Sequence, residues 1–181
     1  NKIDDCRVLP HELGHAYLTD EVNTLQKYNM TVSSLGEAFS MFMQLAFYDY
    51  LKETKYFRNA INMERDFLEN LASIYEMNRD LYAHANDVKV IDNRFVNSYH
   101  KTFSGNTANI FLSKMLAYYL INLYRNGNIE EIKNFIEAYK NSTEYEYFKN
   151  INSEIFKDSL KSEFDYFYES MGKHKSLVKN R

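Results

Sequence analysis

The sequence predicts an all-α protein of six to eight helices, and three features favour that fold class. Only one proline and five glycines occur in 181 residues, so few residues break helices or turn tightly. Apolar residues make up 45% of the chain and recur at helical spacing, which is enough to form a core. The length suits a single domain, which we place at residues 1–181.

Composition also limits the kind of partner that the chain would bind. The net charge of −3 gives no argument for a nucleic-acid partner. No apolar run reaches the roughly 18 residues that would span a membrane, and no signal peptide opens the chain, so no membrane partner is expected. Cys6 is the single cysteine, which excludes a disulfide framework and favours a reducing, cytoplasmic location.

The first predicted helix extends to about Tyr28 and carries the run His11-Glu12-Leu13-Gly14-His15. This run matches H-E-x-x-H, the zinc-peptidase signature. On a helix, His11 and His15 are one turn apart on the same face, so both imidazoles can reach one Zn²⁺. Glu12 lies one residue further round, where its carboxylate can face a water on the metal rather than the metal itself. The run therefore predicts two zinc ligands and a general base.

The alternative is a chance match on a solvated helix face. The apolar neighbours Val8, Leu9 and Tyr17 instead predict a helix that is at least half buried, and buried histidines need polar partners. Pro10 is tolerated in a first helical turn but would kink a longer helix. The motif is therefore expected very close to the start of its helix.

A second helix is predicted from Ser34 to Lys52, after a connection at residues 29–34. Glu37 is the only acid in the apolar stretch 35–47, and two interpretations of it compete. Ser34-x-x-Glu37 fits a capping box, in which Glu37 caps the helix start. Alternatively, Glu37 is a third zinc ligand from a helix packed against the first. Together with His11 and His15 the ligand interpretation is favoured, because a His₂Glu set leaves one zinc position open for catalysis.

The rest of the chain is also expected to be mainly helical. Periodic apolar residues predict a third helix over about Tyr56 to Ala85, followed by a less regular stretch at 86–97. Residues Ile110 to Tyr124 are apolar almost all round and predict a buried central helix. Gly127 would cap its end, and Asn128-x-x-Glu131 would start the next helix. Two further helices are predicted at about 143–156 and 159–171.

His100 lies in the irregular segment Ser98 to Asn106. A histidine brought over the zinc from such a loop could donate a hydrogen bond to the oxyanion that develops during peptide hydrolysis. The alternative is an ordinary surface loop, and the segment alone does not distinguish the two.

The order of these pieces resembles the thimet oligopeptidase and oligoendopeptidase F family of zinc metallopeptidases, more closely its oligoendopeptidase F branch. The residues that carry the resemblance are His11 to Ala16, Glu37-Ala38-Phe39-Ser40 and Phe47 to Leu51. The resemblance implies that His11, His15 and Glu37 bind Zn²⁺, that Glu12 is the general base and that His100 matches the family's downstream histidine. It also implies short peptides as substrates.

The same resemblance would make this chain the C-terminal portion of a larger helical enzyme, with the upstream part of the same polypeptide as its partner. The chain departs from the family in its tyrosines, since positions 105–108 hold Gly, Asn, Thr and Ala, and Tyr118 and Tyr119 come late. A thermolysin-like site is a rival, but it expects an acid at position 41, which is Met.

The sequence therefore predicts a zinc metalloendopeptidase that hydrolyses short peptides through a metal-activated water. The alternative is a catalytically degenerate helical module that serves in binding or assembly and retains the metal site.

Overall fold

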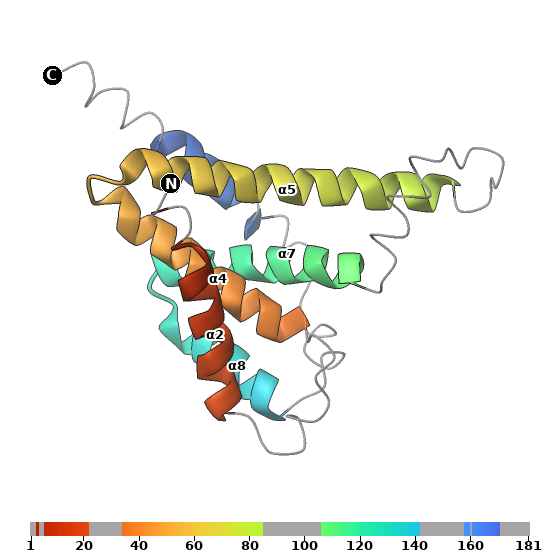
Figure 1. Ribbon diagram of the computed structural model, residues 1–181. Coiled ribbons are helices and arrows are strands. Elements are labelled where there is room, and N and C mark those ends of the chain that lie inside the picture. Colours follow the sequence, from red (N-terminus) through yellow and green to blue (C-terminus); the bar gives the residue numbers. More distant parts are fainter. Residues whose placement is uncertain are drawn as a thin grey trace, which may run out of the picture.

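The computed structural model describes residue 3 and residues 6–21, 34–84, 106–141, 158–159 and 161–170, and these form a helical protein without strands (Figure 1). Its helices are α2 (Val8–Glu21), α4 (Ser34–Lys52), α5 (Phe57–His84), α7 (Asn106–Arg125) and α8 (Ile129–Asn141), with a further helical stretch over residues 161–170. The predicted all-α fold class is confirmed.

Predicted and observed helix limits agree closely where both are defined. Helix α4 has the predicted limits, and α5 is one residue shorter than expected at each end. Helix α7 is longer than the predicted apolar segment because it also includes polar residues at its start. Helix α2 begins at Val8, so Pro10 lies in the first turn, where its missing N–H removes no helical hydrogen bond.

Several sequence predictions fall on residues that the structure does not describe. They are the continuation of the first helix to Tyr28, the connection at 29–33, the irregular stretch 86–97, the loop that carries His100 and the helix at 143–156. These predictions lie outside the described residues.

Helix α4 is the central element of the described fold. It packs against α2, α5 and α7, and in Figure 1 α2 crosses it while α5 and α7 run past it in opposite directions. Its apolar side chains are buried on most sides of the helix, as expected for a helix surrounded by others. The core that they form with the other helices includes Phe39, Leu45, Tyr48, Leu18, Phe67, Leu116, Leu120 and Phe135.

Short-range hydrogen bonds define two of the connections between helices, the turn between α7 and α8 and the connection from α4 to α5. Gly127 has a φ of 75°, in the left-handed region that favours glycine. The N–H of Gly127 donates to the carbonyl of Tyr124, and the N–H of Asn128 donates to the carbonyl of Leu123, which together form a Schellman cap. The predicted glycine cap of α7 is confirmed. At the other end of the core, the Thr54 hydroxyl accepts the Tyr56 N–H at the start of α5.

None of the described helices combines the length and the apolar character needed to cross a membrane.

Candidate metal centre

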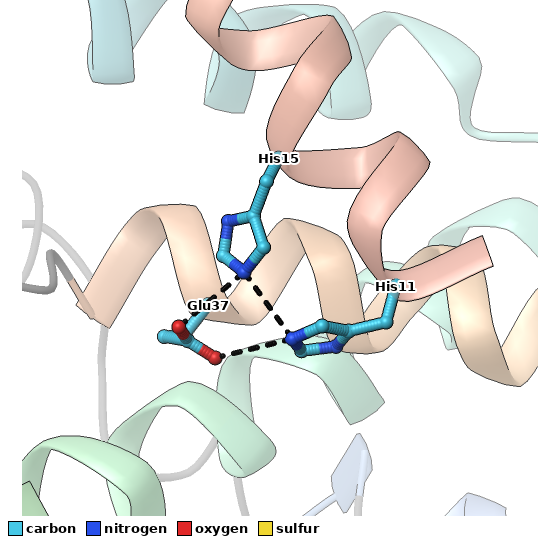
Figure 2. Close-up of side chains that lie close together, drawn as sticks. All are labelled: His11, His15 and Glu37. Carbon is cyan, nitrogen blue, oxygen red and sulfur yellow. Dashed lines mark hydrogen bonds and ion pairs between the residues drawn. The ribbon is translucent and has the colours of Figure 1, made fainter. Parts of the chain in front are cut away.

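The three side chains predicted to bind zinc lie together in the structure. His11 and His15 project from one face of α2, and Glu37 faces them from the first turn of α4 (Figure 2). Their donor atoms all lie within 4.8 Å of one another, and no other group of three possible metal-binding side chains of this compactness is found among the described residues. His15 and His11 precede Glu37 by 22 and 26 positions in the sequence, and the fold brings the three side chains together.

The spacing of the donor atoms fits a four-coordinate zinc ion. The two histidine Nε2 atoms are 3.2 Å apart. Glu37 Oε1 is 3.4 Å from His15 Nε2, and Glu37 Oε2 is 3.6 Å from His11 Nε2. Zinc–ligand bonds of about 2.0–2.1 Å in a tetrahedron require donors roughly 3.3 Å apart. The arrangement therefore needs little adjustment to hold the ion.

A close helix contact sets this geometry. Gly14 lies between the two histidines and packs against Ser40, one turn after Glu37 on α4. A Cβ atom at position 14 would lie 2.6 Å from the Ser40 Cα, closer than real Cβ atoms come, so only glycine permits this approach. Among the side chains of α2 that the structure describes, the buried ones are Pro10, Gly14 and Leu18, which repeat every four residues. This contact places the histidines at the edge of the helix interface, above Glu37.

The rest of α2 is more exposed than the sequence predicts. Val8, Leu9, Leu13 and Tyr17 are each at least half exposed, so the expectation of a helix at least half buried is wrong within the described structure. The reason is that α2 contacts α4 along one narrow face only. The histidines retain about a fifth to a third of their side-chain exposure, which leaves the site open to solvent on one side.

The three side chains also interact electrostatically with one another. Burial lowers the pKa of His11, although the negative charge of Glu37 opposes that effect. The hydrogen bond with Glu37 raises the pKa of His15, and the same bond lowers the pKa of Glu37. Glu37 is therefore ionised, and the site has a carboxylate and two imidazole nitrogens pointing at one space, as a dication requires.

This geometry bears on the capping-box alternative for Glu37. A capping glutamate would turn back to the start of its own helix. Both carboxylate oxygens of Glu37 instead face the histidines of α2. The start of α4 is held in another way, because the Ser113 hydroxyl on α7 donates to the Ser34 carbonyl at 2.9 Å.

Glu12 is exposed on α2, between the two histidines in sequence. Its negative charge acts to raise the pKa of both imidazoles. His100, the other predicted catalytic residue, lies outside the described residues. The structure thus brings together the three predicted ligands, and it adds the Gly14–Ser40 contact. The small residue inside the motif was the only signal of that contact in the sequence.

Comparison of the chain with protein-family models, with curated proteins and with solved structures gave no match.

Proposed function

We propose that this protein is a zinc metallopeptidase that cleaves short peptides. The observation that carries the proposal is the convergence of His11, His15 and Glu37 at zinc-like spacing, with Glu12 beside them on the exposed side. The set has three protein ligands, which is the number that catalytic zinc sites use when they keep a position open. A structural zinc site would more often have four protein ligands.

Each residue has a defined role in this proposal. His11 and His15 would bind the ion through their Nε2 atoms, and Glu37 would supply the negative charge that partly neutralises a dication. Bound zinc would act as a Lewis acid, lowering the pKa of a water molecule and polarising the scissile carbonyl. Glu12 accepts the proton of the attacking water and delivers it to the departing amine. The solvent-exposed position of Glu12 suits this shuttle because water and substrate can reach it.

The downstream histidine belongs to the proposal as well. His100 would donate a hydrogen bond to the oxyanion, as the resemblance to the oligoendopeptidase F family implies. Upstream residues of a longer polypeptide would complete the peptide channel in that family's arrangement. We further propose a cytoplasmic location.

The test combines metal content with peptide hydrolysis. We expect about one zinc per chain by mass spectrometry, lost in Glu37→Ala and kept in the control Glu130→Ala, whose side chain is exposed on α8. Glu12→Gln should keep zinc and lose several orders of magnitude in peptide turnover, because the proton acceptor is removed. Near-normal turnover in Glu12→Gln would exclude Glu12 as the base.

Two other outcomes separate the enzyme from its alternative. Stoichiometric zinc without hydrolysis of any short peptide in a mixed library would favour the helical binding or assembly module that retains the metal site. The absence of zinc from folded, zinc-supplemented protein would overturn the metal site itself, and the peptidase proposal with it.

A further inference from the structure

A second cluster of charged side chains lies at the opposite end of α4 from Glu37. Asp49 and Lys52 come from α4, Glu64 from α5, Arg125 from the end of α7 and Glu163 from the helical stretch 161–170. We call these five residues the ion cluster. Glu64 and Glu163 are fully buried, and Lys52 is nearly so. The ion cluster therefore joins four helices through charged groups that water reaches poorly.

The two cations of the cluster are shared among its three acids. Lys52 Nζ is 2.6 Å from Glu64 Oε1 and 3.0 Å from Asp49 Oδ1. Arg125 donates to both oxygens of Asp49, from Nε at 2.7 Å and from Nη2 at 3.0 Å. Arg125 Nη1 also donates to Glu163 Oε2, and Nη2 lies 3.6 Å from Glu64 Oε1. Each acid thus interacts with a cation through at least one oxygen.

Aromatic groups surround the charges. Both cations lie over the ring of Tyr166, with Arg125 Cζ at 3.7 Å and Lys52 Nζ at 4.4 Å from its centroid. The charge of Glu64 also acts on Tyr118 of α7 and Tyr48 of α4, where it adds to the rise in the pKa of each phenol. Little water is therefore available to stabilise a charge that the cluster leaves unbalanced.

The charges of the cluster do not balance if every acid is ionised. Within the described part of the chain, three carboxylates meet two cations, which leaves one buried negative charge in excess. Two buried carboxylate oxygens, Glu64 Oε2 and Glu163 Oε1, have no hydrogen-bond partner among the described residues, and neither has the Tyr118 hydroxyl. One proton on Glu64 would remove the excess charge.

We propose that Glu64 keeps its proton up to about neutral pH, so that the docking of helix 161–170 onto α4, α5 and α7 weakens as the pH rises. Glu64 is wholly buried, its Oε1 accepts a hydrogen bond from Lys52, and its Oε2 has no partner among the described residues, so a proton on Oε2 neutralises the carboxylate without breaking the contact with Lys52. The proton substitutes for a third cation that the cluster lacks.

The electrostatics of the neighbouring groups agree with this geometry. Burial raises the pKa of Glu64 to about 7; Lys52 opposes the rise and Glu163 adds to it. Burial alone would also raise the pKa of Asp49, but its hydrogen bonds and charge contacts with Arg125 and Lys52 lower that pKa overall. Tyr118 and Tyr166 have pKa values raised mainly by burial, so both remain neutral phenols in this range. The proton therefore resides on Glu64.

The direction of the pH effect follows from proton counting. The folded protein retains a proton on Glu64 up to about pH 7, whereas an unfolded glutamate releases it near pH 4.5. Between these values the folded state binds more protons, so its stability falls as the pH rises, and the loss is complete above about pH 7. One proton changes the unfolding equilibrium constant by about tenfold per pH unit within this window.

The test measures urea unfolding of the full chain and its Glu64→Gln variant between pH 5 and 8. We expect the ratio of wild-type to variant unfolding constants to increase by about tenfold per pH unit and to level off near pH 7. Other titrating groups, including the metal-site histidines, are common to both proteins and cancel in the ratio. A ratio that stays constant across the range would overturn the proposal. The control is Glu69→Gln, an exposed glutamate on the same helix, which should leave the pH dependence unchanged.

A spectroscopic measurement keeps the proposal testable if Glu64→Gln folds poorly. Infrared difference spectra of the wild-type protein should contain a band of a protonated carboxylic acid at pH 6 that disappears by pH 8.5. The conservative variant Glu163→Gln should move this transition to lower pH, because the negative charge of Glu163 raises the pKa of Glu64. A wild-type spectrum without such a band at pH 6 would overturn the proposal.

Discussion

The two ends of α4 carry two charged clusters of different construction. At the N-terminal end, Glu37 faces two histidines, and no fixed positive charge is close enough to pair with it directly among the described residues. At the C-terminal end, Asp49 faces Lys52 and Arg125, which neutralise most of the cluster from within the chain. The twelve residues from 37 to 49 separate them by about 18 Å along the helix.

The difference shows how a charged cluster can be assigned a role. The ion cluster is buried, and its own lysine and arginine hold its acids, so its role is to fix helices to one another. The metal centre is partly open, and no lysine or arginine of the described chain forms an ion pair with its carboxylate, Glu37. A cluster that lacks its own cation is a candidate for a bound one, and a cluster that contains its cations is a structural element.

The largest effect is expected from Arg125→Met, which breaks the ion cluster and leaves the metal centre intact. Removing Arg125 leaves the buried carboxylates of Asp49 and Glu163 without their main partner. Breaking a buried ion pair in this way costs about 3–5 kcal/mol. Urea unfolding at pH 7 should show this loss, while the folded fraction should bind zinc as the wild type does, because Glu37 lies at the other end of the helix.

The control for Arg125→Met is Arg65→Met, on the exposed face of α5, where about half of the side chain is in solvent. Exposed ion pairs contribute little, so this change should stay within about 0.5 kcal/mol of the wild type. If both variants lost the same small amount of stability, the ion cluster would be solvated and the comparison between the two ends of α4 would fail.

An intermediate effect is expected from Gly14→Ala, which should disturb the metal centre by disrupting the packing of α2 against α4. The added Cβ meets the Ser40 backbone at 2.6 Å, so α2 and α4 must separate. We expect a loss of about 1–3 kcal/mol in stability, typical of overpacking. Because His11 and His15 flank Gly14, the same shift should weaken zinc binding by tenfold or more, measured by competition with a chelator.

Gly127→Ala is the matched control, because it makes the same chemical change in a different setting. No atom lies within 4 Å of a Cβ at position 127, so there is no clash. The φ of 75° still makes alanine unfavourable there, at a cost of about 1–2 kcal/mol. Zinc affinity should stay the same. An equal loss of affinity in both variants would mean that general destabilisation, and not the Gly14 contact, controls the site.

Sequence patterns predicted the helices because they depend on local features. The apolar period defined α4 and α5, and the Gly127 cap and the Asn128 start defined the turn between α7 and α8. These signals lie within a few residues of the structure that they specify. The exposure of α2 was mispredicted because burial depends on which helices pack against it, and apolar residues at 8, 9, 13 and 17 carry no information about that.

In the candidate site, too, local features could be predicted from the sequence and tertiary contacts could not. The H-E-x-x-H run is local, so the pairing of His11 and His15 followed from helix geometry. The choice of Glu37 over other acids depended on a tertiary contact, which the structure supplies through Gly14 and Ser40. The ion cluster was not predicted, because its members come from four separate helices. The sequence indicates the ion cluster only through charged residues that stand within an apolar pattern, for example Glu64 between the buried residues Met63 and Phe67.

The smallest effect is expected from Lys114→Met, which tests a charge placed between the two clusters. Lys114 is buried on α7 with its ammonium 3.4 Å from the Phe67 ring centroid, and burial lowers its pKa to about 8. The unfolded chain keeps this proton up to about pH 10.5, so the lysine destabilises the folded state most below pH 8. Methionine should therefore raise stability by about 1 kcal/mol at pH 7, and the gain should shrink as the pH rises above 8.

Lys114→Met should also change the affinity of the metal centre for zinc. The charge of Lys114 acts on His11, so its removal should strengthen zinc binding by a few-fold, since a nearby positive charge repels a dication. Lys133→Met, at an exposed position on α8, should change neither stability nor zinc affinity. A loss of stability in Lys114→Met would show that the lysine has a buried acidic partner.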